Sequence, residues 1–84
     1  MIDVGITISD RGVMNNTIVN GEVFRCNIVL DFIPPLGSWI NVYYLLVEQN
    51  RPVLNKNREW LKLLGSLQIR QISITGKSSI HCEL

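Results

Sequence analysis

The first nine residues alternate strictly between apolar and polar or small side chains. The apolar positions are Ile2, Val4, Ile6 and Ile8, and the positions between them are Asp3, Gly5, Thr7 and Ser9. Because side chains on a β-strand point alternately to opposite faces, this period of two predicts a strand with one buried face. Composition agrees: the 39 apolar residues include 11 Ile, 10 Leu and 8 Val but no alanine. This usage favours strands and argues against an all-helical fold.

Turn-forming residues divide the rest of the chain. Asp10-Arg11-Gly12 is expected to end the first strand, and Asn20-Gly21 to form a type I′ hairpin turn into a second strand over residues 24–32. Pro34-Pro35 stops that strand, and Pro35-Leu36-Gly37-Ser38 predicts a tight turn in which glycine relieves the backbone. The end of the chain predicts a hairpin over 67–75 and 78–84, with a β-bulge at Arg70-Gln71 where the apolar parity slips.

Residues 39–47 are interpreted as a strand that is apolar on both faces. An 84-residue chain has difficulty covering both faces of such a strand by itself, and exposed apolar surface typically marks a partner. Val23 and Val29 add apolar side chains to the outer face of the preceding strand. We therefore expect a protein partner or a homodimer, with a contact surface formed by Val23, Val29, Trp39, Tyr43 and Leu45.

Residues 56–64 predict one short helix. Asn55 or Asn57 is suited to cap it, and Gly65 to end it, although an irregular excursion of the chain is an alternative interpretation. The sequence as a whole predicts a single mainly β (β-rich α+β) domain over residues 1–84. The expected architecture is a small, partly open, antiparallel barrel of five to six strands.

Motifs for catalysis are weak. Thr75-Gly76-Lys77-Ser78 imitates the end of a phosphate-binding P-loop, but Gln71 stands where the motif needs glycine, and a strand follows instead of a helix. His81 and Cys82 point to opposite faces of that strand, and the ligand spacing of a zinc site is missing. Cys26 and Cys82 are interpreted as buried thiols, with a disulfide as the alternative. We expect no enzyme activity, no metal and no cofactor.

Charge excludes a strongly basic nucleic-acid binder, because the net charge is only +1. One local basic segment remains, containing Arg51, Lys56, Arg58, Trp60 and Lys62. Its interpretation is a solvated surface with Trp60 in the core, and the alternative is a single-stranded nucleic-acid site with an aromatic centre. From the lack of a signal-peptide pattern in the first residues, the lack of a long apolar stretch and the low cysteine content, we expect a cytoplasmic protein without a membrane span.

The run from Ile28 to Ile40, with its Pro34-x-x-Gly37-Ser38-x-Ile40 turn, resembles small uncharacterised bacterial and phage-associated proteins. The resemblance implies an SH3-like β-barrel and transfers no functional residue. Pro35 and Ser38 depart from that pattern, in which a basic and an acidic residue are common. The expected function is a non-enzymatic protein-interaction or assembly module of bacterial or phage origin. The alternative is a small nucleic-acid-binding barrel that uses the segment around Trp60.

Overall fold

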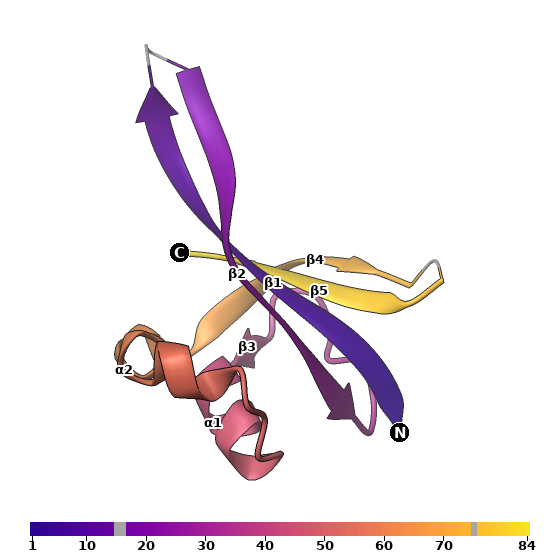
Figure 1. The fold of residues 1–84 in the computed structure, drawn as a ribbon. Helices are drawn as coiled ribbons and strands as arrows, with labels where there is room; N and C mark the ends of the chain where they lie inside the picture. The colour runs from indigo at the N-terminus through magenta and orange to yellow at the C-terminus, as the bar shows by residue number, and fades with distance from the viewer. Residues whose placement is uncertain (15–16, 75) are drawn as a thin grey trace.

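Five strands form one mixed sheet in the computed structural model of the chain, and two helices pack against it (Figure 1). The structure describes residues 1–14, 17–74 and 76–84, with the backbone alone at 11–14, 17–20 and 22. The strands are β1 (Ile2–Met14), β2 (Thr17–Leu30), β3 (Trp39–Ile40), β4 (Leu67–Ser73) and β5 (Ser78–Glu83); the helices are α1 (Val42–Glu48) and α2 (Leu54–Leu64). The strand order is β2-β1-β5-β4-β3. The predicted mainly β, partly open barrel is confirmed.

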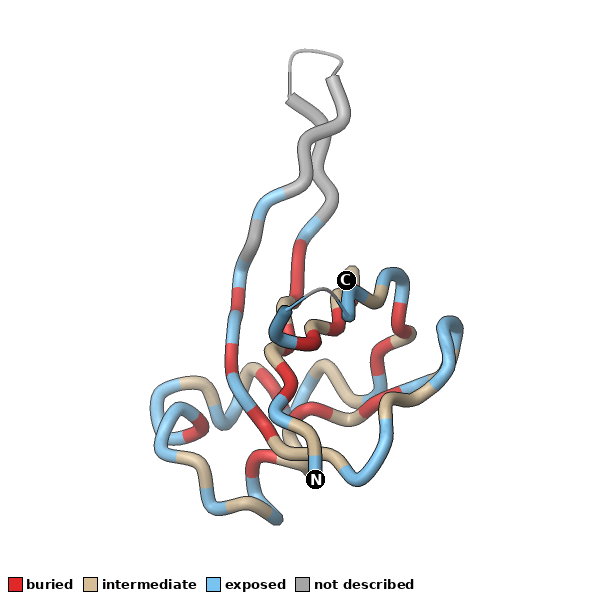
Figure 2. The backbone as a smooth tube through the Cα atoms, turned by 90° about the vertical axis from the view of Figure 1, so that its right-hand side faces the viewer, coloured by how far each residue is buried: buried red, intermediate tan, exposed pale blue. Residues whose placement is uncertain are grey.

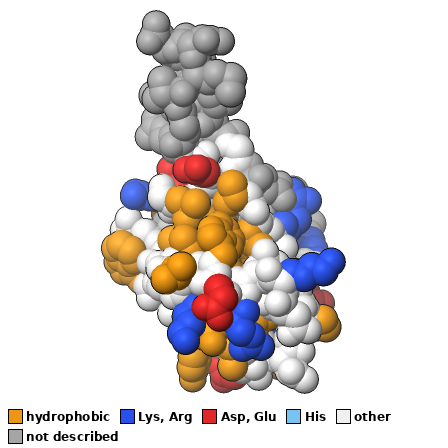
Figure 3. Space-filling view, turned by 60° about the vertical axis from the view of Figure 1, so that its left-hand side comes forward, with side chains coloured by type: hydrophobic (Ala, Val, Ile, Leu, Met, Phe, Trp, Pro, Cys, Tyr) orange, Lys and Arg blue, Asp and Glu red, His pale blue; other side chains and the backbone are white. Residues whose placement is uncertain are grey.

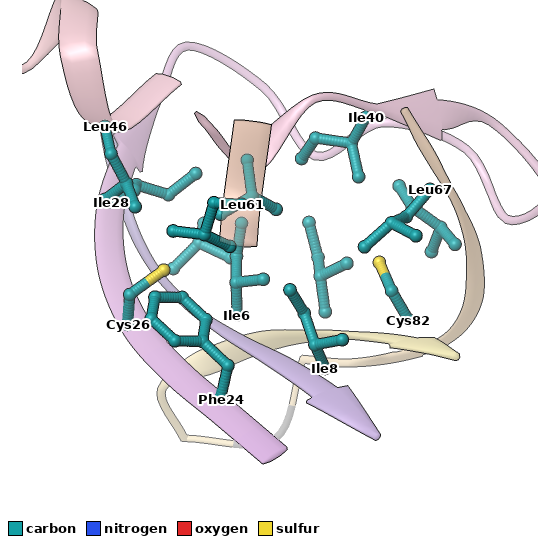
Figure 4. Close-up of a cluster of buried hydrophobic side chains, with 14 of the residues drawn as sticks. Ile6, Ile8, Phe24, Cys26, Ile28, Ile40, Leu46, Leu61, Leu67 and Cys82 are labelled. Carbon is teal, nitrogen blue, oxygen red and sulfur yellow. The ribbon is translucent and has the colours of Figure 1, made fainter. Parts of the chain in front are cut away.

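The alternating patterns bury one face of the sheet, as expected (Figure 2). The buried side chains of β1 and β2 are Val4, Ile6, Ile8, Phe24, Cys26 and Ile28. β3, β4 and β5 add Ile40, Leu67, Ile69, Ile80 and Cys82. Leu46 of α1 and Leu61 of α2 point into the same cluster, so the helices cover the concave side of the half-barrel (Figure 4). Burying apolar surface between the two layers supplies the main favourable term in folding.

One strand pairing differs from the antiparallel prediction. β1 and β5 lie side by side and run parallel, with Ile6 opposite Ile80, whereas the three other pairings are antiparallel. The chain forms two hairpins, β1–β2 and β4–β5, and the segment with both helices connects them. The join between the hairpins brings the first and last strands together in the same direction. Alternation within a strand carries no information about this direction.

The prediction of a strand over residues 39–47 is wrong beyond Ile40. β3 has only two residues, and α1 follows it directly. Asn41 is the N-cap of α1, since its Oδ1 accepts a hydrogen bond of 2.9 Å from the Tyr44 backbone N–H. Val42 and Leu46, four residues apart, form the buried stripe of the helix. The segment has apolar residues at both odd and even positions because it forms a helix, in which residues of either parity can face the core, and not a strand with two apolar faces.

The Asn20-Gly21 turn prediction is also wrong. Both residues lie inside β2, where Gly21 is opposite Asp10 and Asn20 is opposite Arg11, so β1 does not end at Asp10-Arg11-Gly12. Gly21 also lacks the positive φ that a type I′ turn requires. The ladder between β1 and β2 continues to Met14 and Thr17, and the residues between these two lie outside the described part of the chain. Cross-strand pairing overrides the local turn preference here.

The single predicted helix corresponds to α2, and Gly65 ends it with a φ of 66°. The expected caps are wrong, however. Asn55 and Asn57 lie within the helix, and Val53 stands at the N-cap without a side-chain hydrogen bond. The β-bulge at Arg70 is confirmed by the shift from the Ile69–Cys82 pair to the Gln71–His81 pair. A second bulge, which the sequence did not indicate, leaves Val23 without a partner on β1.

Candidate functional site

The predicted tight turn at Pro35-Leu36-Gly37-Ser38 is confirmed and is fixed to the sheet. Within it, the Ser38 N–H donates to the Pro35 carbonyl at 3.1 Å, and Gly37 takes a φ of 88°, as the third residue of a type II turn requires. Towards β4, the Gly37 N–H donates to the Ile69 carbonyl at 3.0 Å, and the Ile69 N–H donates to the Ser38 carbonyl at 2.8 Å. Four hydrogen bonds hold this turn once Gln68 Nε2 is added, which donates to the Gly37 carbonyl at 3.0 Å.

The fixed turn exposes two large apolar side chains, Leu36 and Trp39, which we call the turn surface. Trp39 is 68% exposed and Leu36 is 64% exposed. Trp39 pairs with Gln68 at the edge of the sheet, so its backbone is held although its ring is in solvent. The surrounding sequence, residues 32–47, contains no charged side chain. A large exposed aromatic side chain on a backbone that is held in place is typical of a protein contact surface.

The other residues of the predicted partner surface do not join this area. Tyr43 and Leu45 are half-buried and pack against the core from α1. Val29 is half-buried, and the side chain of Gln49 binds its backbone. Val23 is exposed at the bulge of β2. The prediction placed these side chains together because it assumed a strand over residues 39–47, and the helix removes that assumption.

The structure distributes the α2 residues of the predicted basic segment, Lys56, Arg58, Trp60 and Lys62, over two flanks of the helix. A helix turns about 100° per residue, so Arg58 and Trp60 point roughly 160° apart, whereas Lys56 and Trp60 are neighbours one turn apart. Trp60 is half-buried, and its ring lies 5.9 Å from that of Phe24 at an angle of 53°. On the side of the molecule drawn in Figure 3, hydrophobic side chains gather in the centre, and acidic side chains stand among the basic ones. The residues therefore do not form a basic surface with an aromatic centre.

Two members of the segment do come together, at the turn between α1 and α2. Arg51 and Arg58 line a pocket of about 130 Å³, together with Asn50 and Asn55. Asn50 takes a left-handed φ of 53°, which reverses the chain after α1. The sequence did not indicate this pocket. Arg51 and Arg58 are seven residues apart, and α2 begins between them at Leu54, earlier than the predicted start at residue 56.

A larger depression of about 330 Å³ lies on the convex face of the sheet. It is lined by Gly5, Thr7, Arg25, Asn27, Lys77, Ser78 and Ser79. Lys77 Nζ donates to Asn27 Oδ1 at 2.7 Å across β1. Gly76, with a φ of 70°, and the strand that begins at Ser78 confirm a hairpin turn and not a P-loop, although Thr75 lies outside the described residues. The P-loop-like tripeptide Gly76-Lys77-Ser78 thus contributes to a depression without a helix N-terminus.

The two cysteines are buried free thiols, as interpreted from the sequence. The alternative of a disulfide is wrong, because Cys26 on β2 and Cys82 on β5 lie on strands separated by β1. Burial raises the pKa of Cys26 from 9.0 to about 11, partly opposed by the Arg51 guanidinium, and burial raises the pKa of Cys82 to about 11. Both thiols are protonated near neutral pH and are poor nucleophiles.

Within the part of the chain that the structure describes, no three His, Cys, Asp or Glu side chains are grouped closely enough to hold a metal ion. The same part contains no helix with the length and apolar character needed to cross a membrane. Comparisons with protein-family models, with curated proteins and with solved structures found no match to this chain.

Proposed function

We propose that this chain is a non-enzymatic protein-interaction module that self-associates through the turn surface formed by Leu36 and Trp39. The observation that carries the proposal is the high exposure of two large apolar side chains on a turn that four hydrogen bonds hold in place. A turn whose backbone is already ordered loses little backbone conformational entropy on binding. Tryptophan is one of the residue types that are enriched among binding hot spots.

The charge distribution supports a second copy of the chain as the partner. A two-fold dimer brings the same surface of both copies together, so any charge on that surface meets a like charge near the axis. Residues 32–47 form an uncharged run that includes the whole turn surface. Residues 32–47 themselves therefore add no like-charge repulsion to such a contact, and the apolar side chains of the turn surface gain by leaving water.

Sedimentation equilibrium over a range of protein concentrations tests this proposal. The native chain should show a reversible increase in mass, and Trp39→Glu should remain monomeric, because it buries a carboxylate in the contact. Leu63→Glu is the matched control: Leu63 is 85% exposed on α2 and lies outside the turn surface. Circular dichroism should show that both variants keep the native fold.

Two results would overturn the proposal. One is a native chain that stays monomeric at all concentrations. The other is a dimer that Leu63→Glu disrupts and Trp39→Glu does not, which would assign the contact to the α2 side shown in Figure 3. Dissociation by Trp39→Glu alone supports the turn surface.

A further inference from the structure

We propose that the pocket between Arg51 and Arg58 binds the phosphate group of a small anionic ligand. The pocket lies where the chain passes from α1 into α2 and has a volume of about 130 Å³. Its floor is apolar, with Leu46 and Leu54, and its polar lining consists of Asn50, Arg51, Asn55 and Arg58. This site is separate from the turn surface and does not depend on self-association.

The polar lining offers hydrogen-bond donors with an excess of positive charge. Two guanidinium groups and two amide groups line the pocket, and the described lining residues include no Asp or Glu. Guanidinium donors form a planar fork that matches the spacing of oxygens on a phosphate and binds them bidentately. In α2, the first turn has no acidic residue and no side-chain cap, so the positive end of the helix dipole adds to the same field.

Arg51, one of the two arginines in the lining, makes only a weak contact with its neighbours. Its Nε atom is buried, and no described residue accepts a hydrogen bond from it. Its Nη2 is 3.4 Å from Gln49 Oε1, a long hydrogen bond to an oxygen that already accepts from the Val29 N–H at 2.9 Å. A buried donor without an acceptor is costly, and buried polar groups in native proteins are nearly always satisfied. The contact to Gln49 is long, so the Arg51 guanidinium retains N–H donors that an oxyanion in the pocket could engage.

The size of the pocket and its number of donors select the type of anion. A volume of 130 Å³ is below the roughly 300–1,000 Å³ of sites that enclose a whole drug-sized ligand, so the pocket suits a single charged group. A carboxylate has two oxygens and one negative charge, which is fewer than this lining can engage. A phosphate group has more oxygens and up to two charges, and it matches two guanidinium groups better.

Side-chain NMR of the full chain provides the test, with inorganic phosphate as the probe at constant ionic strength. The Nε–H signal of Arg51 should shift saturably, with a Kd of about 1 mM or tighter. Arg58→Ala should weaken binding about tenfold or more, because it removes a charge-assisted hydrogen bond. Lys62→Ala is the matched control: it removes the same charge one turn further along α2 and outside the pocket, and it should change the affinity less than about threefold.

Further probes identify what the pocket recognises. A 5′-mononucleotide that binds at least as tightly as phosphate, together with a nucleoside that does not bind, assigns recognition to the phosphate group. Acetate binding as tightly as phosphate would overturn the proposal in favour of a carboxylate site. The absence of a saturable shift at Arg51, or equal weakening by Arg58→Ala and Lys62→Ala, would overturn it as well.

Discussion

Gln49 binds both backbone groups of Val29. Its Nε2 donates to the Val29 carbonyl at 2.7 Å, and its Oε1 accepts from the Val29 N–H at 2.9 Å. The side-chain amide thus takes the place of a neighbouring strand at the outer edge of β2. Gln49 is the C-cap of α1, so the same contact joins the helix layer to the sheet. It also covers an edge that could otherwise pair with another chain.

Gln49→Ala should therefore destabilise the fold. It leaves the Val29 N–H and carbonyl without partners in a half-buried position, and we expect the free energy of unfolding to fall by about 1–3 kcal/mol. Urea denaturation measures this change, and hydrogen exchange should show a faster-exchanging Val29 amide. Gln68→Ala is the control, since it removes a single exposed hydrogen bond to Gly37 and should cost less. An equal loss in the two variants would contradict the role assigned to Gln49.

The turn at Gly37 should not tolerate a side chain. Gly37 has a φ of 88°, a region that L-residues with a Cβ atom rarely adopt. We expect Gly37→Ala to lower the free energy of unfolding by about 1–2 kcal/mol. Gly21→Ala is the control, because Gly21 lacks a positive φ and its added Cβ would meet no described atom within 4 Å. If thermal denaturation shows both variants to be equally stable, the turn is not held in the described conformation.

Stability should fall at alkaline pH because of the two thiols. The pKa of each rises from 9.0 to about 11 on folding, so between these values the unfolded chain releases protons that the folded chain retains. The stabilisation is complete below pH 9 and disappears as the pH approaches 11, by up to about 2–3 kcal/mol per thiol. Urea denaturation at pH 8 and pH 10.5 measures the loss. The Cys26→Ala/Cys82→Ala double variant should lose less over the same interval, and an identical loss would exclude the thiols as its source.

The strands could be predicted because their alternation is long and one-sided. Ile2, Val4, Ile6 and Ile8 allow only one buried face. In β4, the bulge at Arg70 is visible in the sequence because the apolar residues change from odd to even positions there. The α1 helix could not be predicted this way. It is seven residues long, its buried pair Val42 and Leu46 also fits a period of two, and its flanking apolar residues fill both parities. Only the Asn41 N-cap distinguishes the two interpretations.

Predicting the candidate sites from the sequence likewise requires knowing where each helix begins. The sequence indicates Trp39 as a surface residue, and it is exposed, but Tyr43 and Leu45 share a surface with it only if residues 39–47 form a strand. The pocket at Arg51 and Arg58 requires α2 to begin at Leu54, and no residue of the sequence marks that start, because Val53 makes no side-chain cap. Tertiary packing, not a capping residue, sets the position of this helix end.

The fluorescence of Trp39 tests the central proposal most directly. In a Trp60→Phe variant, Trp39 is the single tryptophan, and its exposed ring should emit at long wavelength when the protein is dilute. As the concentration rises, we expect a shift to shorter wavelength and protection from a soluble quencher, because the ring leaves water in the dimer. An emission maximum and a quenching constant that stay the same while sedimentation shows dimer formation would contradict the account.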